Sequence, residues 1–135
     1  MKRRLAGLAA VLVLAVAGCS SDTDTPGPSP AAATVQILPR ADGAPSAQDV
    51  VDAFAAAGLP VPSPRDNSGN CAELGCSELV TTDAISVYVF PDEQSAERLA
   101  GPDTHRAGVV VLSYAAARTP ESDRPAYEST LTSLL

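Results

Sequence analysis

Two adjacent runs rich in β-branched residues constrain the fold of this chain more than any other feature. SELVTT (residues 77–82) and ISVYVF (residues 85–90) are separated only by Asp83 and Ala84. Val, Ile, Thr, Tyr and Phe favour strands, and so short a connection can join only antiparallel neighbours. The sequence therefore predicts a β-hairpin at residues 77–90, and the rest of the fold has to pack against it.

Three amphipathic segments are predicted to be helices. In SAQDVVDAFAAAG (residues 46–58), Ser46 can cap the first turn and Gly58 can end the last one. Asp92 can cap a second helix, DEQSAERLA, which Gly101-Pro102 ends. The third helix is expected to begin near Pro125, with Ser122 or Asp123 as its cap and an apolar stripe of Tyr127, Leu131 and Leu134.

The remaining segments complete a prediction of the fold class. GVVVLSY (residues 108–114) is the most apolar strand and is expected inside the sheet with both faces covered. Residues 59–76, which carry three prolines, and residues 103–107 are expected to be loops. The elements predict an α+β two-layer sandwich, in which a small, mainly antiparallel sheet of three or four strands has helices on one face and a C-terminal helix. TVQIL (residues 34–38) is either an edge strand, which would make the order a ferredoxin-like βαββαβ, or the end of a linker.

The start of the chain has the pattern of an export signal. Lys2, Arg3 and Arg4 precede an apolar run that ends at Gly18 and Cys19. A membrane-spanning helix needs about 20 apolar residues, so this run is too short for one. Its last four residues, Val16-Ala17-Gly18-Cys19, resemble the lipobox of bacterial lipoproteins, with Val16 in place of the usual Leu. The resemblance implies cleavage before Cys19 and acylation of its thiol; the alternative is an ordinary secretory signal that contains a cysteine.

Composition divides the chain into three parts. Residues 1–18 are the predicted signal peptide, residues 19–33 the lipidated N-terminus and a tether rich in Ser, Thr, Pro and Gly, and residues 34–135 one α+β domain. Cleavage would remove three of nine basic residues and none of sixteen acidic ones, which changes the formal charge from −7 to −10. Such a surface repels nucleic acid. The only lysine, Lys2, would leave with the signal, which excludes lysine chemistry in the mature protein.

The two other cysteines, Cys71 and Cys76, are expected to form a disulfide. An exported chain meets oxidising conditions, which favour pairing of the two thiols that remain once Cys19 is acylated. Four residues separate them, whereas thioredoxin-like redox sites have two. The bridge is therefore expected to be structural.

Candidate chemistry is sparse. His105 is the only histidine, and no serine lies in a Gly-x-Ser-x-Gly motif that would support it as the base of a hydrolase. No set of Cys and His residues has metal-ligand spacing, so neither a metal nor a cofactor is expected. Alternation in ISVYVF places Tyr88 and Phe90 on one face of the strand. Together with Tyr114 these side chains form either an exposed binding surface or a face buried by the C-terminal helix.

By its layout the chain resembles the small, uncharacterised envelope lipoproteins of high-GC Gram-positive bacteria, a resemblance that implies no activity. The sequence predicts a protein anchored through Cys19 at the extracytoplasmic face of the cell membrane. Its expected role is a non-enzymatic binding or accessory module, with an envelope protein or cell-wall component as partner. Two alternatives stay open: an envelope hydrolase that uses His105, and a purely structural spacer.

Overall fold

The computed structural model describes residues 37–116 and 118–135. The predicted signal peptide, the predicted lipidation site Cys19 and the predicted tether lie outside these residues. The described residues belong to one compact unit, Thr34–Leu135. Within them, no helix has the length and apolar character needed to cross a membrane.

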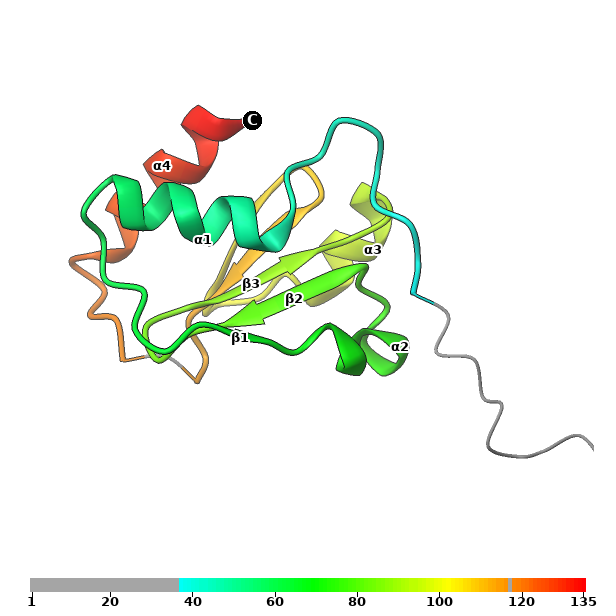
Figure 1. Ribbon diagram of the computed structural model, residues 1–135, viewed down its shortest axis with the longest axis horizontal. Helices are drawn as coiled ribbons and strands as arrows, with labels where there is room; N and C mark the ends of the chain where they lie inside the picture. The colour runs from blue at the N-terminus through cyan, green and yellow to red at the C-terminus, as the bar shows by residue number, and fades with distance from the viewer. Residues whose placement is uncertain (1–36, 117) are drawn as a thin grey trace, which may run out of the picture. The chain divides into compact units, whose positions relative to one another are not determined.

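Helices and strands follow one another in the order drawn in Figure 1. The chain forms α1 (Ala47–Ala56), β1 (Arg65–Asp66), a 3₁₀ turn η1 (Ser68–Asn70), α2 (Cys71–Leu74), β2 (Glu78–Thr81), β3 (Ser86–Val89), α3 (Glu93–Leu99), β4 (Thr104–Ala107), β5 (Val110–Ser113) and α4 (Arg124–Leu134). The predicted α+β class, with a small antiparallel sheet and a C-terminal helix, is confirmed.

Among the described residues, the sheet has five antiparallel strands in the order β1-β2-β3-β5-β4, so the prediction of three or four strands is too low. The predicted hairpin is β2 and β3, in which Thr81 pairs with Ser86 and Glu78 with Val89. As expected, β5 lies inside the sheet, and its residues Val110, Val111 and Leu112 are fully buried. Successive side chains along β2, β3 and β5 point to opposite faces of the sheet. Those on each face belong to a separate hydrophobic cluster.

Helices α1 and α4 cover one face of the sheet. Phe54 of α1 meets Tyr127 of α4 edge to face, with ring centroids 5.1 Å apart. Both rings pack on the inward face formed by Val80, Val87 and Leu112. Tyr127 and Leu131 are buried as predicted, whereas Leu134 is 41% exposed, so the buried stripe of α4 ends at Leu131. The period of a helix indicates its inward face but not where the neighbouring elements end.

The other face is covered by α3 and by the turn that contains the disulfide. Ala96 of α3 packs with Phe90, Val111 and the two cysteines. The sequence predicted the helices on one face of the sheet. Helices α1 and α4 do share a face, but the prediction is wrong for α3, which lies behind the sheet in Figure 1. Because β3 and β5 carry apolar side chains on both faces, this second face also needs a cover.

At two of the three predicted helices, the predicted N-cap side chain makes a capping hydrogen bond. The hydroxyl of Ser46 accepts a hydrogen bond from Asp49 N–H, and the Asp49 carboxylate accepts one from Ser46 N–H, a capping box. Asp92 accepts a bond from Ser95 N–H at the start of α3. At α4 the N-cap position is held by Asp123, but its side chain makes no capping hydrogen bond.

Two predicted loops contain regular structure. Residues 104–107 form the edge strand β4, which a tight turn at Gly108 (φ 57°) connects to β5. Its sequence, THRA, lacks a strong strand signal because an edge strand buries little. The segment 59–76 contains β1, η1 and α2. Ile37 and Leu38 lie outside the sheet, and residues 34–36 lie outside the described residues, so the ferredoxin-like alternative has no strand there in the part of the chain that the structure describes.

Candidate functional site

The aromatic residues singled out from the sequence do not form an exposed surface. Phe90 is 1% exposed and Tyr114 is 3% exposed, and only Tyr88 is half-buried. Tyr88 and Phe90 stack with ring centroids 6.3 Å apart, on the face covered by α3 and the disulfide turn. The predicted binding surface is wrong for Phe90 and Tyr114. The alternative, burial by the C-terminal helix, applies to Tyr114 alone, because α3 covers the other two.

Cys71 and Cys76 are joined by a disulfide bond. Both cysteines are buried, Cys71 at the start of α2 and Cys76 just before β2. Gly75, between them, adopts the left-handed conformation that ends α2. The bond closes this turn against Leu79 and Phe90, which gives it a structural role.

His105 lies on β4 and faces α4. Its Nδ1 is 3.6 Å from Oε2 of Glu128, and each of these side chains is about one-third exposed. His105 pairs with Leu112 across the sheet, which turns its ring toward the face that α4 covers. The structure thus supplies a carboxylate beside the histidine. A hydrolase would also need a nucleophile and a cavity, and His105 lines neither of the two cavities described below.

Arg124 connects α4 to the end of β5. Its guanidinium lies 4.6 Å above the Tyr114 ring, and its Nη1 is 3.3 Å from Asp103. Tyr114 donates a hydrogen bond to the Arg124 carbonyl over 3.4 Å. Burial, and then the nearby Glu128 carboxylate, raise the pKa of Tyr114 well above its usual range. Tyr114 is therefore a neutral structural phenol rather than an acid or base.

A cavity of about 400 Å³ opens at the end of the sheet that carries the β2–β3 turn. Three segments far apart in sequence form it: the proline-rich loop after α1, the turn at Asp83 and the loop that precedes α4. Its lining is mainly apolar. The lining residues are Pro60, Pro62, Asp83, Ala84, Arg118, Thr119, Pro120, Asp123 and Tyr127.

A second cavity of about 320 Å³ adjoins the first, with Asp83 and Arg118 in both linings. It is more polar than the first cavity, and Thr81, Thr82 and Ser86 are among its lining residues. Arg65 and Ala116 complete the lining. We refer to the two cavities together as the Asp83 groove.

Hydrogen bonds fix the three segments of the Asp83 groove to one another. The Tyr127 hydroxyl donates to the Pro60 carbonyl over 2.6 Å, and the Thr119 hydroxyl donates to the Ala84 carbonyl over 2.5 Å. In the backbone, Asp83 N–H donates to the Pro62 carbonyl over 3.0 Å, and Arg118 N–H donates to the Asp83 carbonyl over 3.3 Å. The groove is therefore built before any ligand arrives.

Within the turn itself, the Thr82 hydroxyl accepts hydrogen bonds from Ala84 N–H and Ile85 N–H and donates one to the Ile85 carbonyl. Thr82 is 7% exposed, so its hydroxyl is used inside the protein. The connection between β2 and β3, residues 82–85, is thus held by its own hydrogen bonds, which keep Asp83 in the lining of both cavities.

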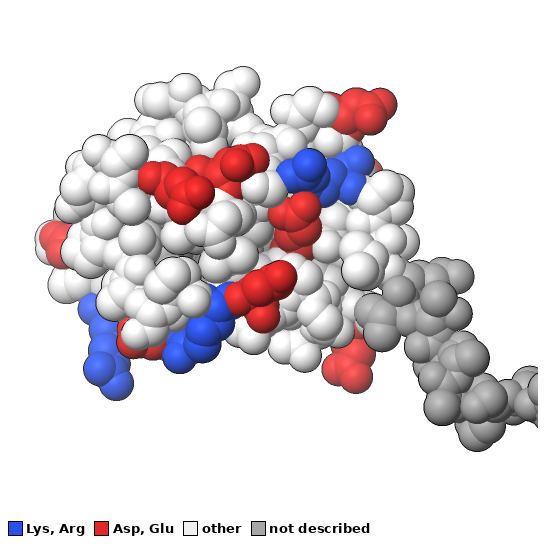
Figure 2. All heavy atoms as spheres, in the orientation of Figure 1, with Lys and Arg blue, Asp and Glu red and all other residues white. Residues whose placement is uncertain are grey.

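Charges in the Asp83 groove are only partly paired. Arg65 Nη2 is 3.0 Å from Asp83 Oδ1, a surface ion pair. Asp123 accepts a hydrogen bond from the Ser122 hydroxyl but takes part in no ion pair of the described residues. Arg118 is exposed and likewise has no ion pair there. On the face shown in Figure 2, one group of basic atoms lies at the end where the β2–β3 turn lies in Figure 1.

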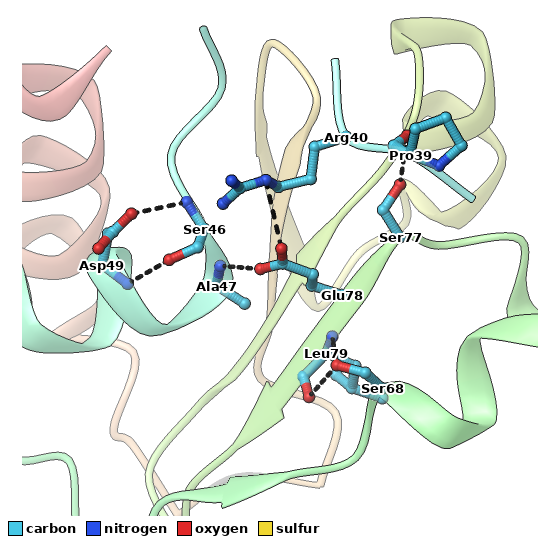
Figure 3. A network of polar contacts seen from close by, with 9 residues as sticks. All are labelled: Pro39, Arg40, Ser46, Ala47, Asp49, Ser68, Ser77, Glu78 and Leu79. Carbon is cyan, nitrogen blue, oxygen red and sulfur yellow. Dashed lines mark hydrogen bonds and ion pairs between the residues drawn. The ribbon is translucent and has the colours of Figure 1, made fainter. Parts of the chain in front are cut away.

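The opposite end of β2 holds the N-terminal junction, which we define as residues 39–47. In Figure 3, Ser77 donates to the Pro39 carbonyl over 3.0 Å, and Arg40 Nε is 3.3 Å from Oε1 of Glu78. The other Glu78 oxygen accepts a hydrogen bond from Ala47 N–H over 2.8 Å. Glu78 thus ties the segment before α1 to the first turn of α1. Glu78 begins β2, whereas Asp83 lies in the turn that follows the other end of this strand.

No sequence pattern predicted the Asp83 groove, although the prolines at its rim indicated a loop. Among the described residues, no cluster of three His, Cys, Asp or Glu side chains could hold a metal ion. The chain matches no protein-family model, no curated protein and no solved structure at a significant level. The function must therefore be argued from the geometry.

Proposed function

We propose that this protein is a lipid-anchored, extracytoplasmic module that binds an envelope protein or cell-wall component in the Asp83 groove without catalysing a reaction. The lipobox-like sequence at Val16–Cys19 supports the anchor, and the acidic mature chain disfavours nucleic acid as a partner. The observation that carries the binding role is the preformed groove, whose mainly apolar cavity meets a polar one at Arg118.

The position of the N-terminal junction is consistent with this role. Pro39 and Arg40 contact Ser77 and Glu78, at the end of β2 remote from the groove. A chain tethered through this junction would keep its attachment away from the ligand. A spacer, by contrast, has no need of a cavity held open by hydrogen bonds between three segments.

One observation supports the alternative of a hydrolase that uses His105, namely the contact of His105 with Glu128. This pair lies outside the linings of both cavities of the described residues. A reaction would need substrate, nucleophile and base in one place. The geometry therefore favours binding over hydrolysis.

Site-specific photo-crosslinking in intact envelopes tests the proposal. A benzophenone amino acid placed at Ala116, an exposed residue of the groove, should capture one recurrent partner. The same group at Gln94, exposed on α3 behind the sheet, is the matched control and should not capture it. Capture of nothing at Ala116, or of the same products at both positions, would favour the spacer.

A further inference from the structure

We infer that the Asp83 groove binds the carboxyl-terminal end of a peptide, with the carboxylate on Arg118 and the terminal side chain on the apolar lining. The inference rests on the proposed function and names the ligand class of the same site.

The first reason is the state of Arg118. Among the described residues, four arginines pair with carboxylates: Arg40 with Glu78, Arg65 with Asp83, Arg106 with Glu93 and Arg124 with Asp103. Arg118 has no such partner there, is exposed, and lines both cavities. A guanidinium group binds a carboxylate through two parallel hydrogen bonds. Arg118 therefore offers a ready binding point for one anionic group.

The second reason selects a carboxylate over a phosphate. Asp83 and Asp123 also line the first cavity. Arg65 compensates Asp83, but Asp123 has no cation among the described residues. A phosphate monoester carries about −1.5 to −2 charges at pH 7, so the neighbouring carboxylates repel it more strongly than a group with a single charge. The two aspartates of the lining thus disfavour a phosphate more than a carboxylate.

The third reason concerns the rest of the ligand. Pro60, Pro120 and the Tyr127 ring give the first cavity an apolar wall beside Arg118, which suits an aliphatic side chain. On the other side of Arg118, the half-buried Ser86 hydroxyl lines the second cavity and can bond to a peptide group. A C-terminal aliphatic residue supplies all three features within one short segment. The cavities, at about 400 and 320 Å³, are of the size that holds such a segment.

The test uses the full chain in detergent and fluorescence anisotropy of an N-terminally labelled Ala-Ala-Leu peptide. The free acid should bind at least about tenfold more tightly than its C-terminal amide, because a hydrogen bond to a charged group is lost in the amide. A labelled peptide that carries a phosphoserine and ends in an amide should bind no better than the unphosphorylated amide.

Arg118→Gln should remove the advantage of the free acid over the amide. The matched control is Arg98→Gln on α3. Arg98 is also exposed, forms no ion pair among the described residues and lines neither cavity. Melting temperatures of both variants verify that they are folded.

Three results would overturn the inference: no binding of the free acid up to about 1 mM, equal affinities for acid and amide, or equal effects of the two substitutions. Preference for the phosphopeptide would instead assign the groove to phosphate groups and also overturn it. Recurrent crosslinking at Ala116 combined with any of these results would leave the binding role standing and reject only this ligand class.

Discussion

Breaking the bond between Cys71 and Cys76 should lower the free energy of unfolding by about 2 kcal/mol. The two cysteines are five positions apart, so the bond closes a short ring. In the chain-entropy account, such a ring restricts the unfolded chain by about 2 kcal/mol at 25 °C. For a domain of about 100 residues, that loss corresponds to a fall of roughly 8–16 °C in Tm.

Replacing both cysteines with Ala should cost more than reduction does. Reduction keeps the two buried sulfur atoms against Leu79 and Phe90, whereas the double substitution removes them. An unfilled space of about the size of a methyl group costs about 1 kcal/mol. With one such space at each of the two positions, the double variant should be destabilised by about 4 kcal/mol, and the difference between the two experiments separates packing from chain entropy.

Urea unfolding followed by circular dichroism measures both effects, on the mature chain with and without dithiothreitol and on the double variant. Reductant should not change the double variant, which makes that variant the control. The reasoning would be refuted if reduction changed stability by less than about 0.5 kcal/mol. It would also fail if reduction cost more than the double substitution, because repulsion between the two buried thiols would then outweigh the loss of the sulfur atoms.

Three further predictions concern titration and anchoring. Burial raises the pKa of Tyr114 and Tyr127 in the folded protein. Their contribution to the free energy of unfolding is therefore complete below about pH 10, the value for an unfolded chain, and is lost as the pH rises further. Tyrosinate absorbance should show two late-titrating groups, and Tyr114→Phe should leave one. Hydrogen bonds from Ser95 hold the pKa of Asp92 below its usual value, so Asp92→Ala should destabilise the protein relative to the parent at neutral pH and progressively less below about pH 4. The stability difference between Asp92→Ala and Asp92→Asn should not change with pH, because neither side chain titrates; a constant gap between Asp92→Ala and the parent would contradict the reasoning. Cys19→Ala should abolish acylation and lipoprotein-type processing, and a variant that stayed with alkali-washed membranes and carried a cleaved N-terminus would disprove the anchor.

The β2–β3 hairpin could be predicted because the residues that define it are neighbours in the sequence. Two β-branched runs and a two-residue connection define the strands, and the period of two assigns Val87 and Tyr88 to opposite faces. The caps at Ser46 and Asp92 are local in the same way. Such features need no knowledge of what packs against them.

Burial of the aromatic residues could not be predicted in this way. The pattern correctly separated Phe90 from Val89, but both faces of β3 and β5 are covered. Whether the second face is open depends on the path of α3, which no residue of β3 encodes. The edge strand β4 was missed for a related reason, since its pairing with β5 comes from the turn at Gly108 rather than from its own composition.

The Asp83 groove lies at the limit of this kind of prediction. Its walls come from the loop at residues 60–65, the turn at residues 82–86 and the loop before α4. Only the fold brings Pro60 to Tyr127 and Thr119 to Ala84, through the hydrogen bonds that join these segments. From the sequence, each segment reads as an ordinary loop or turn.

The N-terminal junction and the Asp83 groove lie at opposite ends of β2, which matters for a domain attached through its N-terminus. At Glu78 the strand holds the N-terminal junction through Arg40 and Ala47, and beyond its other end Asp83 lines the groove. Tension on a tether would act first on the contacts at Glu78, because the chain reaches the sheet there. The contacts that shape the groove, Tyr127 to Pro60 and Thr119 to Ala84, do not involve the junction. A ligand could therefore bind in the groove without competing with the attachment, as a binding module on a lipid anchor requires.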